Sequence, residues 1–192
     1  DLVRSRGLGD VYKRQILRTG NRYTFMANIS GFLFIQRDNI FIDGNGFFLQ
    51  GDGAGYGFDL TGRSNVTISD CTIRNFWIGV HVYFSSGVLL MNNRVGPNEG
   101  GGFQIMSSKG TRMIKNNLTR NGGSAIWLSW SMGNNVSNNL VANNYAGIMI
   151  AASSAIMRNN SISESIFNFG IDGQLLSHFM NDIDTSNTVN SR

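Results

Sequence analysis

The sequence repeats itself every 22 or 23 residues from Asp38 onward. Apolar residues return at this spacing in several columns at once. The first two columns, five residues apart, contain Ile68, Leu90, Met113, Val136 and Met157, and Ile73, Val95, Leu118, Val141 and Ile162. Repeats of roughly 20 to 50 residues are typical of solenoids, propellers and other arrays. The repeat therefore restricts the fold class before any single residue is considered.

Each repeat contains three short stretches in which apolar and polar residues alternate, separated by Gly, Asn and Ser. Alternation with a period of two predicts strands buried on one face, and the stretches are too short for helices. Two further apolar columns, two residues apart, contain Phe58, Val80, Phe103, Ile126, Ile148 and Ile171, and Leu60, Val82, Ile105, Leu128 and Ile150. The pattern predicts an all-β, single-stranded parallel β-helix (solenoid) with about 22–23 residues per coil, stacked about 4.8 Å apart.

Asparagine and glycine, 24 residues each, fill a quarter of the chain. Many of the asparagines form columns of their own: Asn93, Asn116, Asn139 and Asn160 stand two residues before the second apolar column, and Asn98, Asn121 and Asn144 form another. Asparagine tolerates the left-handed backbone of tight turns, and stacked amides bond to one another. We expect a structural asparagine ladder in the turns, with Cys71 occupying one rung as a buried, unreactive thiol.

The N-terminal segment differs from the rest of the chain. Ser5–Gln15 (SRGLGDVYKRQ) is identified as a translated sequencing adapter, so residues 1–15 are interpreted as non-native. Residues 16–37 are then expected to form a cap or partial coil, and residues 38–192 a β-helix truncated at the C-terminus. Without residues 1–15 the net charge falls from +4 to +2, which gives no indication of a nucleic-acid partner. No apolar run is long enough to span a membrane.

Several motifs carry a family resemblance. IDGNG (Ile42–Gly46), GRSNVTI (Gly62–Ile68), the repeated Asn-Asn pairs and NDIDTSNTVN (Asn181–Asn190) together resemble the right-handed parallel β-helix repeat proteins, and more narrowly the NosD-type domain of the pectin-lyase-like superfamily. The resemblance implies a right-handed coil and an extracytoplasmic location (cell surface, secreted or periplasmic); a signal peptide is not present in this fragment. Such families include surface proteins, polysaccharide-active enzymes and a periplasmic protein implicated in copper delivery.

The residue between the third and fourth apolar columns is expected to face solvent. This outward row contains Asp59, His81, Gln104, Trp127, Met149 and Asp172, and Tyr83 and Trp130 are expected to flank it. Carboxylates and amides bond hydroxyl groups, and an indole stacks on the apolar face of a sugar ring. We therefore predict a glycan-binding strip made of Asp59, His81, Tyr83, Gln104, Trp127 and Trp130. Asp59 and His81, about 5 Å apart on neighbouring coils, are the candidates for proton transfer.

Three functions stay open at this point. The first is a non-catalytic β-helix domain that serves as a surface scaffold or binds polysaccharide. The second is a lyase, epimerase or hydrolase: Tyr56–Asp59 matches the start of the YGFDPH motif of mannuronan C5-epimerases, but Leu60 and Thr61 follow where that motif has Pro and His. The third is NosD-like copper delivery. No cofactor or metal site is indicated: calcium and copper have no ligand cluster in the sequence, and Met113 and Met157 lie in core columns. The oligomeric state is not indicated.

Overall fold

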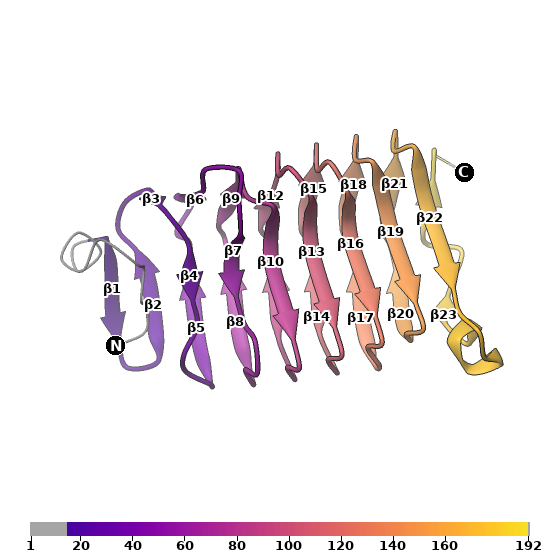
Figure 1. The fold of residues 1–192 in the computed structure, drawn as a ribbon, viewed down its shortest axis with the longest axis horizontal. Helices are drawn as coiled ribbons and strands as arrows, with labels where there is room; N and C mark the ends of the chain where they lie inside the picture. Colours follow the sequence, from indigo (N-terminus) through magenta and orange to yellow (C-terminus); the bar gives the residue numbers. More distant parts are fainter. Residues whose placement is uncertain (1–14, 192) are drawn as a thin grey trace.

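The protein is a parallel β-solenoid. The computed structural model describes residues 15–191, in which one short helix accompanies the strands. Seven consecutive coils each contribute one strand to each of three sheets, which gives the stack in Figure 1. This confirms the predicted all-β solenoid and its coil length. The adapter assigned to residues 1–15 lies outside the described residues, except for Gln15.

Each of the three sheets is named by how many strands it contains. The nine-stranded sheet contains β1 (Ile16–Thr19), β2 (Arg22–Phe25), β5 (Ile40–Asp43), β8 (Val66–Ser69), β11 (Leu89–Met91), β14 (Arg112–Ile114), β17 (Asn134–Ser137), β20 (Ala155–Arg158) and β23 (Asp182–Ile183). The eight-stranded sheet contains β3 (Ile29–Ser30), β6 (Phe48–Gln50), β9 (Thr72–Arg74), β12 (Arg94–Val95), β15 (Asn117–Thr119), β18 (Leu140–Ala142), β21 (Ser161–Ser163) and β24 (Thr188–Val189). The seven-stranded sheet contains β4 (Leu33–Phe34), β7 (Tyr56–Asp59), β10 (Ile78–Tyr83), β13 (Gly101–Met106), β16 (Ser124–Ser129), β19 (Ala146–Ala151) and β22 (Phe167–Asp172). The short helix is η2 (Leu176–Phe179), a 3-10 turn after β22.

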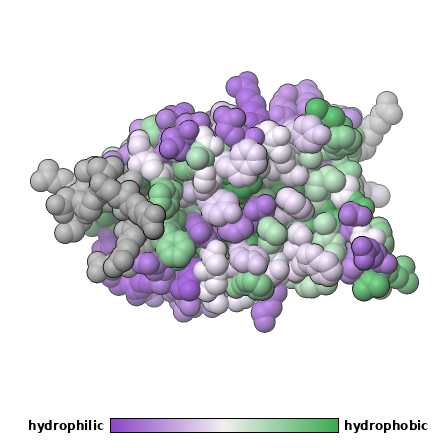
Figure 2. All heavy atoms as spheres, viewed as in Figure 1, coloured by the Kyte–Doolittle hydropathy of each residue, from purple (hydrophilic) through white to green (hydrophobic). Residues whose placement is uncertain are grey.

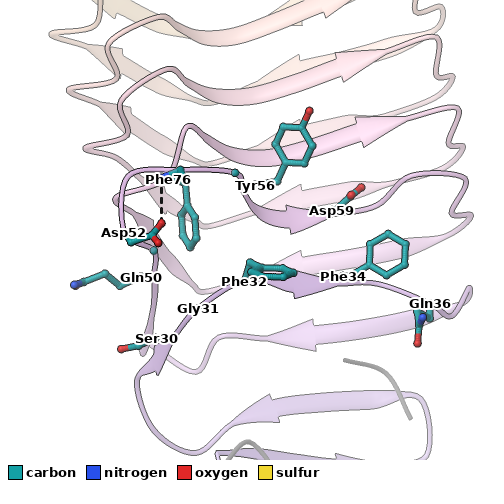
Figure 3. A pocket seen from close by; sticks show the side chains of 13 residues that line it. Ser30, Gly31, Phe32, Phe34, Gln36, Gln50, Asp52, Tyr56, Asp59 and Phe76 are labelled. Atoms are coloured by element: carbon teal, nitrogen blue, oxygen red, sulfur yellow. Dashed lines mark hydrogen bonds between the residues drawn. The ribbon is translucent and has the colours of Figure 1, made fainter. Parts of the chain in front are cut away.

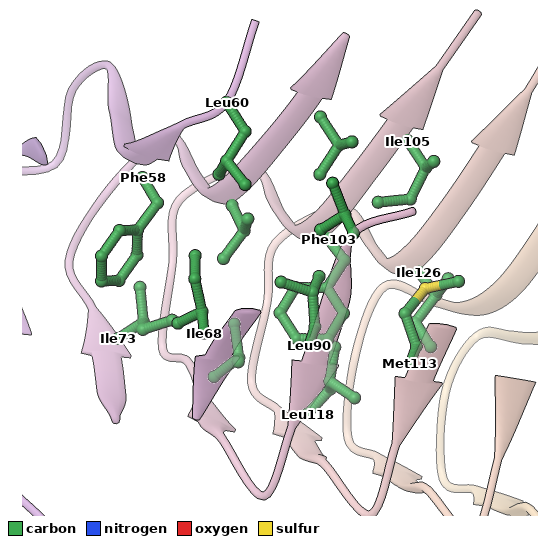
Figure 4. Close-up of a cluster of buried hydrophobic side chains, with 14 of the residues drawn as sticks. Phe58, Leu60, Ile68, Ile73, Leu90, Phe103, Ile105, Met113, Leu118 and Ile126 are labelled. Atoms are coloured by element: carbon green, nitrogen blue, oxygen red, sulfur yellow. The ribbon is translucent and has the colours of Figure 1, made fainter. Parts of the chain in front are cut away.

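Strand pairing follows the predicted columns. Leu90 pairs with Ile68 on one side and Met113 on the other, and Val95 pairs with Ile73 and Leu118. All pairs between coils are parallel, and only β1 and β2 pair antiparallel, at the N-terminal end of the stack. The column residues are almost completely buried and fill the interior of the coils (Figure 4). The core therefore consists of apolar ladders that run along the solenoid axis.

The last members of two columns are corrected by the pairing. Ile148 pairs with Phe169 and Ile150 with Ile171, so Ile171 belongs to the fourth column and not to the third. Gly170, rather than Asp172, consequently continues the outward row after Met149. The reason is that this coil has 21 residues on every sheet, as the pairing of Val136 with Met157 also shows. Within one strand the neighbouring columns must shift together, because the backbone hydrogen bonds fix a single register.

Buried amides form a continuous ladder inside the corner between the nine-stranded and eight-stranded sheets, as predicted. The four predicted rungs, Asn93, Asn116, Asn139 and Asn160, lie one coil apart and are followed by a partly buried fifth, Asn187, which was not predicted. The Nδ2 of each of the first four donates to the next Oδ1 at 2.8–3.1 Å. The same Oδ1 atoms accept backbone N–H groups, and each Nδ2 also donates to a carbonyl of the preceding coil, as Asn116 does to Leu90 at 2.9 Å. Every polar atom of these buried side chains is thus satisfied.

Cys71 occupies the rung before Asn93. Its thiol is buried, and its backbone N–H donates to Asn93 Oδ1 at 3.2 Å. Burial raises the pKa of Cys71 to about 12; a backbone hydrogen bond from Leu49 lowers it and the Asp43 carboxylate raises it further. The thiol is therefore protonated and unreactive at neutral pH, as the sequence predicted.

Two further polar ladders stabilise the other corners. The predicted column of Asn98, Asn121 and Asn144 is confirmed, with amide contacts of 2.9 and 2.8 Å. A serine ladder at the end of the seven-stranded sheet was not predicted: after the first rung, each hydroxyl accepts the backbone N–H of the serine one coil earlier. Its members are Ser85, Ser108, Ser131 and Ser153. Their regular spacing of 22 or 23 residues was present in the sequence and could have identified them.

Removing one rung of the main ladder should destabilise the whole stack. Asn116→Ala removes the Oδ1 that accepts from the Asn93 backbone N–H and side-chain amide, and the Nδ2 that donates to the Leu90 carbonyl, all in a buried site. We expect the free energy of unfolding to fall by about 3 kcal/mol, measured by urea denaturation. Asn117→Ala is the matched control, because the neighbouring side chain is only partly buried and its Oδ1 has no partner among the described residues. An equal loss in both variants would contradict the structural role of the ladder.

Candidate functional site

The outer face of the seven-stranded sheet differs in charge from the other two. Its described strands contain no Lys or Arg, and their only charged residues are Asp59 and Asp172. The nine-stranded sheet, by contrast, exposes Arg112 and the eight-stranded sheet exposes Arg94. Figure 2 shows pale and apolar side chains over much of the middle of the molecule, with the most hydrophilic ones gathered towards its upper and lower borders. The face is thus suited to uncharged or apolar contacts.

The structure brings together four of the predicted site residues on this face. Asp59 pairs with His81, His81 with Gln104, and Gln104 with Trp127, each on the next strand along the axis. Their side chains point away from the core because the flanking residues, such as Val80 and Val82, point into it. The predicted row therefore exists as a line of outward side chains across β7, β10, β13 and β16.

His81 is the most enclosed member of this row. Its ring stacks on Tyr56 at a centroid distance of 4.2 Å and lies 5.8 Å from the Tyr83 ring, so only 7% of the residue is exposed. Nδ1 lies 2.9 Å from Gln104 Oε1, and an oxygen acceptor there places the ring proton on Nδ1. Burial lowers the pKa of His81, although the Asp59 charge and the Gln104 hydrogen bond oppose this. The imidazole is consequently neutral at pH 7.

Asp59 makes its hydrogen bonds within its own turn. Its Oδ1 accepts the Thr61 backbone N–H at 3.0 Å and the Thr61 hydroxyl at 2.6 Å. Asp59 and His81 thus lie on adjacent strands, but in the described structure each is hydrogen-bonded to a different residue. The arrangement fixes both side chains in place and leaves polar groups along the face for contact with hydroxyl groups.

A large hollow of about 820 Å³ lies beside Asp59. Phe32, just before β4, and Phe34, on β4, line one side of the hollow. Tyr56, on the neighbouring strand β7, also lines it (Figure 3). The loop Gly51–Gly55 between β6 and β7 forms a wall, where the Asp52 carboxylate accepts the Ala54 backbone N–H at 3.2 Å. Phe32 and Phe34 are 41% and 36% exposed, so two apolar rings face solvent at this hollow.

A second hollow of about 370 Å³ lies further along the same face, beside Gln104 and Trp127. Its floor contains Gly100 and Gly123, which follow Trp77 at one-coil steps in the turn before the seven-stranded sheet. A Cβ atom at Gly100 would lie 2.5 Å from the Trp77 carbonyl oxygen and 3.0 Å from its indole ring. The absence of a side chain at Gly100 therefore leaves room for the Trp77 indole. Tyr145 closes the other side.

Three exposed aromatic residues of this second hollow were not predicted from the sequence. Trp77, Tyr145 and Phe167 are 57%, 52% and 54% exposed. Trp77 and Tyr145 precede their strands, in the column that contains the two glycines, whereas the predicted strip lies within the strands and the turns after them. Tyr83 contacts His81, and Trp130 lies in the turn after β16, edge-on to His178 at 5.8 Å. Neither Tyr83 nor Trp130 lines either hollow.

Residues 15–191 contain neither a candidate metal cluster nor a membrane-spanning helix. Within that range, no three His, Cys, Asp or Glu side chains are grouped so that they could hold a metal ion. No helix in that range is long and apolar enough to cross a membrane.

With the coil geometry established, the sequence can be placed in a family. Residues 18–167 match the family described as the right-handed β-helix region. The chain is a right-handed β-helix protein. No curated protein sequence is significantly similar to it.

Solved structures share the fold of this β-helix protein. A pectate lyase, Pel9A, has a TM-score of 0.62 at 13% identity, over 77% of this chain and 44% of the lyase. An alginate lyase from Paenibacillus sp. str. FPU-7 has a TM-score of 0.62 at 12% identity, over 83% of this chain and 76% of the lyase. Tailspike protein 2 of the Escherichia coli O157:H7 bacteriophage CAB120 has a TM-score of 0.56 at 15% identity, over 80% and 30%. The chain thus spans less than half of the pectate lyase, and the likeness is one of fold.

The buried imidazole should make stability depend on pH. The pKa of His81 is lowered from 6.5 in the folded state, so the unfolded chain binds more protons below that pH. His81 therefore lowers the free energy of unfolding as the pH falls through 6.5 toward the folded pKa. His81→Phe retains a ring beside Tyr56 but cannot titrate. Urea denaturation at about pH 7.5 and pH 5 should show a smaller loss of stability for the variant. Equal losses in both proteins would show that His81 is not buried as described.

Proposed function

We propose that this β-helix is a non-catalytic, extracytoplasmic glycan-binding module, whose ligand lies along the outer face of the seven-stranded sheet. The observation that carries the proposal is the set of exposed aromatic rings around two hollows on one face. Trp77, Trp127 and Tyr145 surround the second hollow, and Phe32 and Phe34 the first. Aromatic rings with an apolar face and a polar rim are suited to stacking against sugar rings.

The polar groups between these rings supply the complementary contacts. Asp59 lines the first hollow and Gln104 the second, and they present oxygen and amide groups to hydroxyl groups of a ligand. Their positions are fixed by hydrogen bonds to Thr61 and His81, so little side-chain entropy is lost when a ligand binds. Since neighbouring coils repeat about every 4.8 Å, the row suits an extended chain that runs along the solenoid axis.

The similar structures are consistent with this proposal. Two of them are a pectate lyase and an alginate lyase by name, and both act on polysaccharides. The present chain has the same fold, but Asp59 and His81 are hydrogen-bonded to Thr61 and Gln104 rather than arranged as a free acid–base pair. We therefore propose binding without turnover.

Truncating the indole in the second hollow should weaken glycan binding. Trp127→Ala removes an exposed ring from the row, and we expect affinity to fall about tenfold in affinity-gel electrophoresis. Trp130→Ala is the matched control: it removes a more exposed indole three residues later that lines neither hollow. Circular dichroism should show intact folds for both.

Other results would contradict the proposal. If the two variants lose affinity equally, the ligand does not lie in the second hollow. If the unaltered protein is not retained by any polysaccharide gel while folded, the chain is not a glycan-binding module. Release of unsaturated or reducing ends from a polysaccharide, abolished by His81→Phe, would show that the face is catalytic.

A further inference from the structure

The proposed glycan would meet a face without cations. No Lys or Arg is present in the described strands of the seven-stranded sheet, and none lines either hollow. The second hollow has no charged lining residue: its polar groups are amide, hydroxyl and indole groups, such as those of Gln104, Ser124 and Trp127. A ligand there exchanges hydrogen bonds with neutral partners only.

The charged residues that line the hollows are negative. Asp52 and Asp59 line the first hollow, and Glu99 lies beside its wall, with Cγ 3.7 Å from the position of a Cβ at Gly53. The nearest cations lie behind the lining: Arg74 donates to Gln50 at 2.9 Å, and Arg120 stands at the corner between the eight-stranded and seven-stranded sheets, but neither lines a hollow. A carboxylate of a ligand in the second hollow would consequently be desolvated without a lining cation to compensate.

From this distribution we infer that the ligand is a neutral glycan, a chain of uncharged hexoses or pentoses, and not a polyuronate. The inference rests on the proposed function and specifies its substrate class. It separates this chain from the pectate and alginate lyases that share its fold. Stacking on Trp77, Trp127 and Tyr145 uses the apolar faces of sugar rings, which neutral sugars present without the cost of an unpaired carboxylate.

The test compares the folded protein on gels that contain galactomannan, xyloglucan or mixed-linkage β-glucan with gels that contain polygalacturonate or alginate, each with EDTA or calcium. We expect retention by at least one neutral polymer, with an affinity at least about tenfold above that for either polyuronate. Retention by the neutral polymer should not change between about 20 and 500 mM NaCl, because no ion pair contributes to it.

A charge-gain variant makes the inference sharper. Met149→Lys places an ammonium group beside Trp127 in the second hollow, and we expect it to gain polyuronate binding that weakens with salt. Met106→Lys is the matched control, since it adds the same charge to the outward face of β13 but outside both hollows. A gain in the first variant alone supports the inference.

The outcomes separate the inference from the proposed function. The unaltered protein could be retained by polyuronate, with EDTA or only with calcium, and lose this retention in Trp127→Ala. That result would overturn the inference of a neutral ligand but leave the glycan-binding function standing. An equal gain of polyuronate binding in both lysine variants would overturn the inference that the lack of cations in the second hollow determines which glycan binds. The absence of retention on every polymer would overturn both proposals.

Discussion

The hydrogen bonds between successive coils are the constraint on which the rest of this structure depends. Each backbone strand pairs with the strand before and after it in one parallel register, so a residue inherits its inward or outward direction from its partner one coil away. The apolar columns and the ladder of Asn93, Asn116, Asn139 and Asn160 are consequences of that register. The coil of 21 residues keeps this register on all three sheets, where Val136 pairs with Met157, Val141 with Ile162 and Ile148 with Phe169.

The corners meet a second demand, since the chain must turn three times in each coil. One residue at a corner commonly adopts a left-handed backbone, as Asn92, Lys115 and Asn138 do at φ of 55–57° after the nine-stranded sheet. Asparagine suits these positions, and a second asparagine directly after it supplies the buried amide. The Asn-Asn pairs of the sequence thus combine two tasks: the first residue makes the turn and the second binds the neighbouring coils.

The buried half of the molecule was predictable from sequence and much of the outer surface was not. Columns such as Ile68, Leu90 and Met113 are repeated because each must fit the same core, and the repetition is visible in the sequence. Phe169 was missed because a shortened coil was counted as a full one. Trp77 and Tyr145 were missed because outward residues follow no repeat: their neighbours in the column are glycines, and only the three-dimensional stack shows that this makes a hollow.

The coil from β5 to β8 is longer than those after it, yet its strands pair in the same way. Ile42 and Ile68 are paired although 26 residues separate them, because the corners before β6 and β7 each contain two residues more than the corresponding corners of the next coil. The pairing on either side is undisturbed, and the second insertion, Gly51–Gly55, forms a wall of the larger hollow. A solenoid of this kind can therefore acquire or exchange surface loops at its corners while its interior stays unchanged. Ligand preference can then diverge through the length and sequence of one corner, independently of the stability of the stack.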